Sequence, residues 1–377
     1  MSGPRVRARD LGIAIGTYPT GKHNAITDVA GIEVGHTTVS WGDASLPPGR
    51  GPARTGVTVI WPHRDGIVRN PVSAGFFALS GTGEMTARSE IEELGRINAP
   101  LALTNTMSVG IVYDAVCRYL VERDPEIGDT ESVIIPLVAE CDDSYLNDSR
   151  GFHVTREHVY AALDGARGEP VGEGAIGAGT GMHLFGFKGG IGTSSRLLPE
   201  AEGGWTVGVL ALTNFGRRPR LTVDGVPVGR LYEGVGNREQ GVVGEGEDEG
   251  SGIVVVATDA PLDGRQLARV AKRAALGLGR TGSTGGNGSG ELLVAFSTTY
   301  RPGESGVSSK PILEGGAIDP IFAAAVDATE EAVLNALFMA TTTVGRKGNV
   351  DEAIDIDRVR ELLTRSGRPI ATDGGVG

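Results

Sequence analysis

The chain has 377 residues, of which 40% are hydrophobic and 22% charged, and its formal net charge is −12 at pH 7. This composition predicts a globular protein with a substantial core, and the acidic balance argues against nucleic acid and anionic membranes as partners. Glycine contributes 60 residues that are spread among apolar runs, so we expect many tight turns between short elements.

No stretch of the sequence has the pattern of a signal peptide or a membrane span. The apolar residues 11–16 form too short a run for a signal peptide, and no apolar run reaches 18 residues. The two cysteines, Cys117 and Cys141, form no CxxC motif and are expected to be buried thiols in a reducing compartment. We therefore expect a cytoplasmic protein.

Short apolar segments bounded by Gly, Pro, Asn or Asp predict a series of strands. In chain order they cover residues 32–39, 55–62, 132–140, 205–214, 251–257 and 291–298. Residues 221–231 predict a hairpin, since Asp224-Gly225 supplies two residues that accept positive φ.

Apolar residues at helical spacing predict a helix over residues 263–279, with arginines and Lys272 on its other face. Asp263 and Gln266 have the spacing of a capping box at its start. Similar patterns cover about 106–121, 327–343 and 351–364. The alternation of strand and helix groups predicts layers of sheet and helix, an α/β or α+β architecture.

The acidic, glycine-rich residues 233–250 are the best candidate for a linker. The segments on both sides have the same strand character, however, and residues 251–377 contain only two evident strands and three helices. Because that is too little for an independent core, we predict a single domain over 1–377 with an exposed loop.

Ser251 lies on the border between the acidic loop and the buried run Ile253–Ala257. No histidine follows it, so a nucleophilic Ser251 needs a base from far upstream, or one that is not a histidine. A serine is also activated when it becomes a chain N-terminus, because its own α-amine can take the hydroxyl proton. That arrangement needs a cut after Gly250, which has no side chain and tolerates a strained peptide geometry.

Other polar residues lie at predicted strand ends. Ser289 and Glu291 are two apart at the start of a strand, so their side chains share a face. Asn214 ends a strand and could present its amide as an oxyanion donor, and residues 139–148 place acids and a tyrosine after another strand. Each pattern also fits an ordinary polar turn.

Several chemical motifs are excluded. Residues 181–190 lack the Gly-Lys-Ser/Thr ending of a phosphate loop, and no helix pattern follows the glycines of 177–182. The six histidines show no metal-site spacing and are interpreted as structural or surface residues.

Taken together, these segments resemble the self-processing serine aminopeptidases typified by L-aminopeptidase/D-amino-acid esterase-amidase, with the β-peptidyl aminopeptidases as close relatives. The matching segments are residues 24–39, 73–86, 102–110, 139–148, 179–196, 210–216, 250–262 and 287–298. Their number and order over nearly the whole chain make the resemblance far more specific than a single motif.

The resemblance implies autocatalytic cleavage between Gly250 and Ser251, with Ser251 as the new N-terminal nucleophile. Ser289 and Glu291 match family positions that assist this nucleophile and anchor its amine. The products would be an α fragment, residues 1–250, and a β fragment, residues 251–377.

The resemblance also assigns the substrate side of the site. Asn214 matches the oxyanion-stabilising amide, Tyr145 a site tyrosine, and Glu140 an acid that binds the free amino group of the substrate. No metal or organic cofactor is implied. The family fold is a four-layer αββα sandwich, and its members form oligomers of processed α/β pairs.

The sequence departs from the family pattern near the expected amine pocket. Cys141-Asp142 precedes Asp143, and Ser144 stands where a glycine is expected. The preferred side chain of the substrate therefore does not follow from the resemblance.

The leading interpretation is an aminopeptidase or amidase that releases N-terminal residues from short peptides, amino-acid amides or esters through an acyl-enzyme. Two alternatives are an acyltransferase similar to the ornithine acetyltransferases, which use a threonine nucleophile, and a non-catalytic binding protein of the same fold. The serine at position 251 favours hydrolysis over the former.

Overall fold

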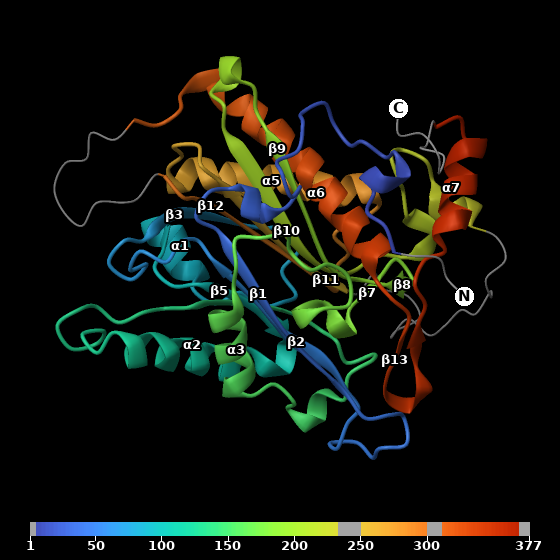
Figure 1. The fold of residues 1–377 in the computed structure, drawn as a ribbon, viewed down its shortest axis with the longest axis horizontal. Helices are drawn as coiled ribbons and strands as arrows, with labels where there is room; N and C mark the ends of the chain where they lie inside the picture. The colour runs from blue at the N-terminus through green and yellow to red at the C-terminus, as the bar shows by residue number, and fades with distance from the viewer. Residues whose placement is uncertain (1–4, 233–249, 300–310, 369–377) are drawn as a thin grey trace.

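Two β-sheets that face each other form the centre of the molecule (Figure 1). The structure, a computed structural model, describes residues 5–232, 250–299 and 311–368. The four-stranded sheet has the order β1-β2-β5-β6 and the six-stranded sheet the order β4-β3-β12-β11-β10-β9.

The strands of the four-stranded sheet are β1 (Glu33–Trp41), β2 (Ala53–Trp61), β5 (Leu101–Asn105) and β6 (Leu137–Cys141). Those of the six-stranded sheet are β3 (Val72–Ala78), β4 (Arg96–Ile97), β9 (Gly190–Leu197), β10 (Thr206–Asn214), β11 (Gly250–Thr258) and β12 (Ser289–Ser297). Each sheet contains one parallel pair, β5–β6 and β11–β12, and the other pairs are antiparallel.

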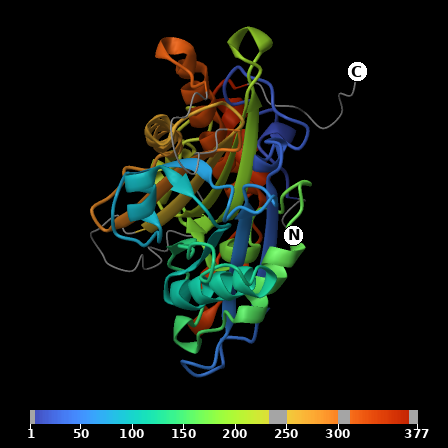
Figure 2. The ribbon, with the colours of Figure 1, turned by 90° about the vertical axis from the view of Figure 1, so that its left-hand side faces the viewer.

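Each parallel pair is joined by a helix, because a parallel connection must cross from one end of the sheet to the other. The helix between β5 and β6 is α2 (Val109–Arg123), and that between β11 and β12 is α5 (Gly264–Thr281). With α3 (Arg156–Gly165), α2 covers the four-stranded sheet, and α5 covers the six-stranded sheet with α6 (Asp319–Met339). Figure 2 shows these two helix layers again, with the teal and green helices below and the orange and red helices above. The expected αββα order of layers is confirmed.

Strand β11 illustrates how the sequence produces this arrangement. Its side chains alternate between two cores, with Ile253 and Val255 packed between the sheets and Val254 and Val256 packed under the helices. Because both faces are buried, the strand is a continuous apolar run without polar alternation.

Smaller elements complete the chain. The helices are α1 (Arg88–Leu94), α4 (Val228–Leu231) and α7 (Ile356–Arg365), and the short strands are β7 (His183–Leu184), β8 (Phe187–Lys188), β13 (Thr343–Val344) and β14 (Val350–Asp351). The 3₁₀ helices cover Arg9–Leu11, Ile26–Asp28, Thr106–Ser108, Ser149–Gly151, Gly177–Gly181, Glu200–Glu202, Arg218–Arg220, Gly315–Ile318 and Arg346–Gly348. None of the helices in the described ranges is both long and apolar enough to cross a membrane.

The helix predicted at 263–279 is α5, and its capping box is present. The Gln266 N–H donates to Asp263 Oδ1 at 2.7 Å, and the Asp263 N–H donates to Gln266 Oε1 at 3.1 Å. The other three predicted helices correspond to α2, α6 and α7 with shifted ends.

Two strand predictions are only partly correct. Asp224 and Gly225 do adopt positive φ, but the only pairing around them is the single bridge Val223–Val226, so residues 221–231 form a turn and α4 rather than a hairpin. Within 132–140, the strand begins only at Leu137, after Pro136. Pro136, which has no N–H to donate to a ladder, immediately precedes the first residue of β6. Of the predicted linker 233–250, only Gly250 lies within the described residues.

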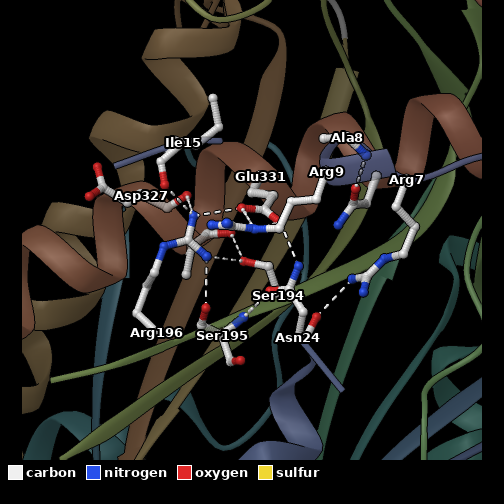
Figure 3. Close-up of polar contacts among 12 residues, drawn as sticks. Arg7, Ala8, Arg9, Ile15, Asn24, Ser194, Ser195, Arg196, Asp327 and Glu331 are labelled. Carbon is white, nitrogen blue, oxygen red and sulfur yellow. Dashed lines mark hydrogen bonds and ion pairs between the residues drawn. The ribbon is translucent and has the colours of Figure 1, made fainter. Parts of the chain in front are cut away.

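A buried charge network ties the N-terminal segment to β9 and α6 (Figure 3). Arg196 of β9 is fully buried, donates to the Ile15 carbonyl at 2.8 Å and pairs with Glu331 of α6 at 2.7 Å. Glu331 also pairs with Arg9 at 3.0 Å. The network thus joins segments more than 300 residues apart in the chain.

Candidate active site

Ser251 is the second residue of β11 and only 5% exposed. It lies between β10 and β12, where its register partners are Asn214 and Gly290. Its side chain has the same parity along the strand as Ile253 and Val255, so it points toward the space between the two sheets. The border seen in the sequence therefore corresponds to the edge of the inter-sheet core.

Asn214, the last residue of β10, contacts the Ser251 hydroxyl directly. Its Nδ2 donates to Ser251 Oγ at 3.0 Å and to the Asp142 carbonyl at 2.9 Å. Its Oδ1 accepts from the His183 N–H at 2.9 Å. Both ends of the amide are therefore held, and one N–H is directed at the position of the nucleophile.

Ser289 and Glu291 begin β12 and are buried at 3% and 0% exposure. The Ser289 hydroxyl donates to Glu291 Oε1 at 2.6 Å, as their spacing on one strand face allows. In the parallel register Gly250 aligns with Ser289 and Gly252 with Glu291, so the pair flanks the Gly250–Ser251 peptide. A Cβ at Gly252 would lie only 3.1 Å from the Phe215 ring, which explains a glycine beside Glu291.

Glu140 of β6 is a nearly buried carboxylate at 4% exposure. Its Oε1 accepts from the Glu84 N–H at 2.9 Å, and its Oε2 accepts from the Thr106 hydroxyl. Burial raises the pKa of Glu140, against these two hydrogen bonds. No arginine, lysine or histidine within the described part of the chain forms an ion pair with it.

Cys141 lies between these groups and is fully buried, whereas Cys117 is only half-buried. Burial raises the pKa of the Cys141 thiol well above its usual value, with Glu140 and Glu291 adding to the shift and a hydrogen bond with Ser251 opposing it. A neutral thiol therefore packs against the nucleophile from the four-stranded sheet.

Tyr145 lies at the outer side of this cluster, with its ring 6.1 Å from the ring of His183. Its backbone carbonyl accepts from Asn349 Nδ2 at 2.7 Å. Burial raises the pKa of the Tyr145 hydroxyl, and the nearby charge of Asp351 adds to this effect.

The structure places Asn214 against Ser251 at the edge of the inter-sheet core. Ser289 and Glu291 lie on the adjacent strand β12, on the face that Leu293 and Ala295 turn toward the helices, so their side chains leave the sheet on the side opposite to Ser251. Glu140 lies on the facing sheet, and Tyr145 lies beside His183. Sequence reasoning missed His183, Asp351 and Lys188. His183 Nδ1 lies 2.8 Å from Asp351 Oδ1, and its Nε2 accepts from the Gly186 N–H at 3.2 Å. No spacing pattern reveals these contacts, because most involve backbone groups or distant segments. In the described part of the chain, no cluster of three or more His, Cys, Asp or Glu side chains is arranged to hold a metal ion.

The sequence profile described as Peptidase family S58 matches residues 24–351. The chain belongs to peptidase family S58. It is therefore an enzyme of the peptidase class, as the resemblance implied.

Named relatives agree with this assignment. Over 373 residues the chain is 43% identical to β-peptidyl aminopeptidase BapA of Sphingosinicella xenopeptidilytica, which covers 96% of this chain and 92% of that protein. The expected aminopeptidase function is thus confirmed at the level of the family.

Solved structures of family S58 relatives have the same fold. L-aminopeptidase D-Ala-esterase/amidase from Ochrobactrum anthropi, described as a new variant among the Ntn hydrolase fold, is 41% identical with a TM-score of 0.88 over 97% of this chain and 99% of that one. A Burkholderia sp. β-aminopeptidase is 38% identical with a TM-score of 0.88 over 97% of this chain and 100% of that one.

Proposed function

We propose that this family S58 peptidase cuts itself between Gly250 and Ser251 and then uses Ser251 as an N-terminal nucleophile. The contact that carries the proposal is the 3.0 Å hydrogen bond between Asn214 Nδ2 and Ser251 Oγ. It places a preorganised amide donor at the one hydroxyl that directly follows the glycine of the proposed cut.

In the self-cleavage step, Ser251 Oγ attacks the Gly250 carbonyl carbon. The C–N bond breaks, the nitrogen takes the hydroxyl proton, and an ester joins Gly250 to Ser251. Water hydrolyses this ester and leaves a Gly250 carboxylate and a free Ser251 amine. Ser289 and Glu291 would then hold the amine, since they flank its nitrogen in the register of β11 and β12.

In substrate turnover, Ser251 Oγ attacks the scissile carbonyl and its proton passes to the Ser251 amine. The Asn214 N–H that contacts Oγ stabilises the oxyanion that develops beside it. The amine passes the proton to the departing nitrogen, or to the alcohol oxygen of an ester. Water then releases the acyl group.

Glu140 would bind the free amino group of the substrate. A buried carboxylate without an ionic partner gains from a cationic ligand, because the ligand offsets the cost of burying its charge. Tyr145 would lie beside His183 at the edge of the site. Together these roles favour short peptides, amino-acid amides or esters with an unblocked N-terminus.

The remaining predictions concern assembly and location. We propose one catalytic domain over 1–377, cut into fragments 1–250 and 251–377 that stay together. We expect an oligomer of such pairs from the resemblance, and a cytoplasmic location from the two free cysteines.

Intact mass spectrometry of the purified chain tests the proposal. We expect two masses that correspond to residues 1–250 and 251–377, and a single mass with no amidase activity for Ser251→Ala. A Ser251→Ala chain that still cuts itself and hydrolyses amino-acid amides would contradict the mechanism. Acyl transfer from acetylornithine to glutamate without amide hydrolysis would favour the acyltransferase alternative.

A further inference from the structure

Lys188 of β8 is a lysine with no solvent exposure. Its ammonium donates to the carbonyls of Gly179 at 3.0 Å, Met182 at 2.7 Å and Gly189 at 2.8 Å. All three of its N–H donors are therefore used on the loop that surrounds it. We call residues 179–189 the lysine loop.

One peptide group of the lysine loop connects Lys188 to the candidate site. The Met182 carbonyl accepts from Lys188, and the N–H of the same peptide group, that of His183, donates to Asn214 Oδ1 at 2.9 Å. In a trans peptide the C=O and N–H point in opposite directions. Lys188 and the Gly189 N–H, which donates to the same oxygen at 3.0 Å, hold the carbonyl and so direct the His183 N–H at the Asn214 side chain.

The contacts continue through the Asn214 amide to Ser251. Oδ1 accepts at one end, and Nδ2 donates to Ser251 Oγ at the other. Hydrogen bonds in such a chain polarise one another, so a cation at the first carbonyl strengthens the last donor. It also fixes which end of the amide faces the hydroxyl.

The lysine loop is held from the other side as well. The His183 side chain contacts Asp351 at 2.8 Å, and the backbone N–H of Lys188 donates to the Glu352 carbonyl at 2.8 Å. A Cβ at Gly181 would lie 2.8 Å from Asp143 Cβ, so the loop packs closely on the segment that follows β6. The Met182–His183 peptide group thus has little freedom to rotate.

We propose that Lys188 is a positioning residue that orients and polarises the Asn214 amide through the Met182–His183 peptide group. This inference rests on the proposed role of Asn214 as oxyanion donor. Lys188 itself touches neither Ser251 nor the expected position of the substrate.

The test is a double-mutant cycle in the full-length, processed enzyme, with kcat and KM measured on an amino-acid amide. Asn214→Ala is expected to lower kcat by roughly 10²–10³, as loss of an oxyanion donor does. Lys188→Met should lower kcat by about tenfold, since small misplacements of catalytic groups cost up to 10². Its KM should stay within about twofold. Added to Asn214→Ala, Lys188→Met should change kcat by less than about twofold, because its effect acts through Asn214.

Arg7→Met is the matched control for the loss of a loop-binding cation. Arg7 also donates to three backbone carbonyls, those of His23, Asn24 and Thr193 at 3.1, 2.7 and 2.7 Å, but none of its contacts is with a residue of the candidate site. It should lower the melting temperature and leave kcat unchanged. Lys188→Gln, which keeps an NH₂ donor, should recover part of the kcat lost in Lys188→Met.

Three outcomes would overturn the inference. In the first, folded Lys188→Met has the kcat of the unsubstituted enzyme; in the second, the two single effects multiply in the double variant. The third needs no variant: fast hydrogen exchange of the His183 amide in the unsubstituted protein would show that this peptide group is not held. If Asn214→Ala itself leaves kcat unchanged, the proposed oxyanion role fails, which is a distinct result.

Discussion

Glu140 shows how burial alone can prepare a residue for a charged ligand. Its carboxylate accepts two hydrogen bonds, from the Glu84 N–H and the Thr106 hydroxyl, but has no ionic partner within the described residues. The charges of Asp142 and Glu84 add to the effect of burial and raise its pKa further. The ammonium group of a substrate would stabilise the ionised form of Glu140 and so oppose the effects of burial and of the two nearby charges.

Glu140→Gln should therefore raise KM for amides with a free amine while leaving kcat much less affected. The substitution keeps an acceptor for the Glu84 N–H and removes the charge, and its NH₂ can donate to the Thr106 hydroxyl oxygen in place of the acceptor that is lost. Loss of a charged hydrogen bond of about 1.5–3 kcal/mol predicts an increase of roughly 10–150-fold in KM. Steady-state kinetics on an amide with and without an N-acetyl group would measure it, since the acetylated substrate should not distinguish the two enzymes.

Glu84→Gln is the control for a nonspecific charge effect. Glu84 is exposed, and it donates its backbone N–H to Glu140 while its side chain acts on Glu140 only through its charge. An equal rise in KM for both variants would mean that the overall negative field, and not a direct contact, attracts the substrate.

The sequence predicted some of these residues from local geometry. Ser289 and Glu291 share a strand face whatever the rest of the fold, so their hydrogen bond was accessible to a spacing argument. The contact between Asn214 and Ser251 depends on the register of β10 against β11, which no local pattern contains. Lys188 was missed because its partners are carbonyls, which every residue carries.

At the scale of elements, the predicted strands are those with a long apolar run. β11 and β10 are buried on both faces and were readily recognised. β9 (Gly190–Leu197) is equally buried but consists largely of Gly, Ser and Thr, so it has no hydrophobic signature. It is stabilised by tertiary contacts, such as the Ser194 hydroxyl donating to the Ala328 carbonyl of α6 at 2.8 Å.

The 3₁₀ helix Gly177–Gly181 packs on β1 and β2 beside His36, a histidine that is partly buried. His36 Nδ1 lies 2.9 Å from Thr58 Oγ1, and a Cβ at Gly177 would lie 2.8 Å from that nitrogen. Burial lowers the pKa of His36 to about 4. The folded protein therefore holds this ring neutral at a pH where the unfolded chain protonates it.

Stability should consequently fall as the pH decreases from about 6.5 to 4, because the unfolded state binds the extra proton. The His36 contribution to this loss should be roughly 2–3 kcal/mol. The loss due to His36 should appear as a difference in the pH dependence of the unfolding free energy between Ser251→Ala and Ser251→Ala/His36→Gln. Urea unfolding of these two uncut chains at several pH values would measure it. Titrating carboxylates common to both proteins cancel in that difference. Parallel pH profiles of the two variants would contradict a buried neutral His36.

At the scale of the whole molecule, the family relationship and the layer order were predictable from the sequence, because many ordered segments carry them. The side-chain contacts between segments far apart in the chain were not predictable from the sequence. The ion pair between Arg196 and Glu331 joins residues 135 positions apart, and both side chains are completely buried. Its contribution to the stability of the fold depends on that burial. Such contacts arise only when the two segments are already in place.

The central position of β11 has a consequence for the molecularity of folding. This strand begins at the proposed cut, yet it pairs with β10 from the first fragment and with β12 from the second. The uncut chain can form this sheet as a first-order process, whereas separated fragments must first meet. After dilution from urea, the yield of refolded secondary structure should thus depend on the protein concentration for the cut enzyme and be independent of it for Ser251→Ala. Refolding over a hundredfold range of protein concentration would show the difference. Self-cleavage then makes synthesis as one chain the efficient route to this fold, and an enzyme that has lost its structure in dilute solution would not regain it.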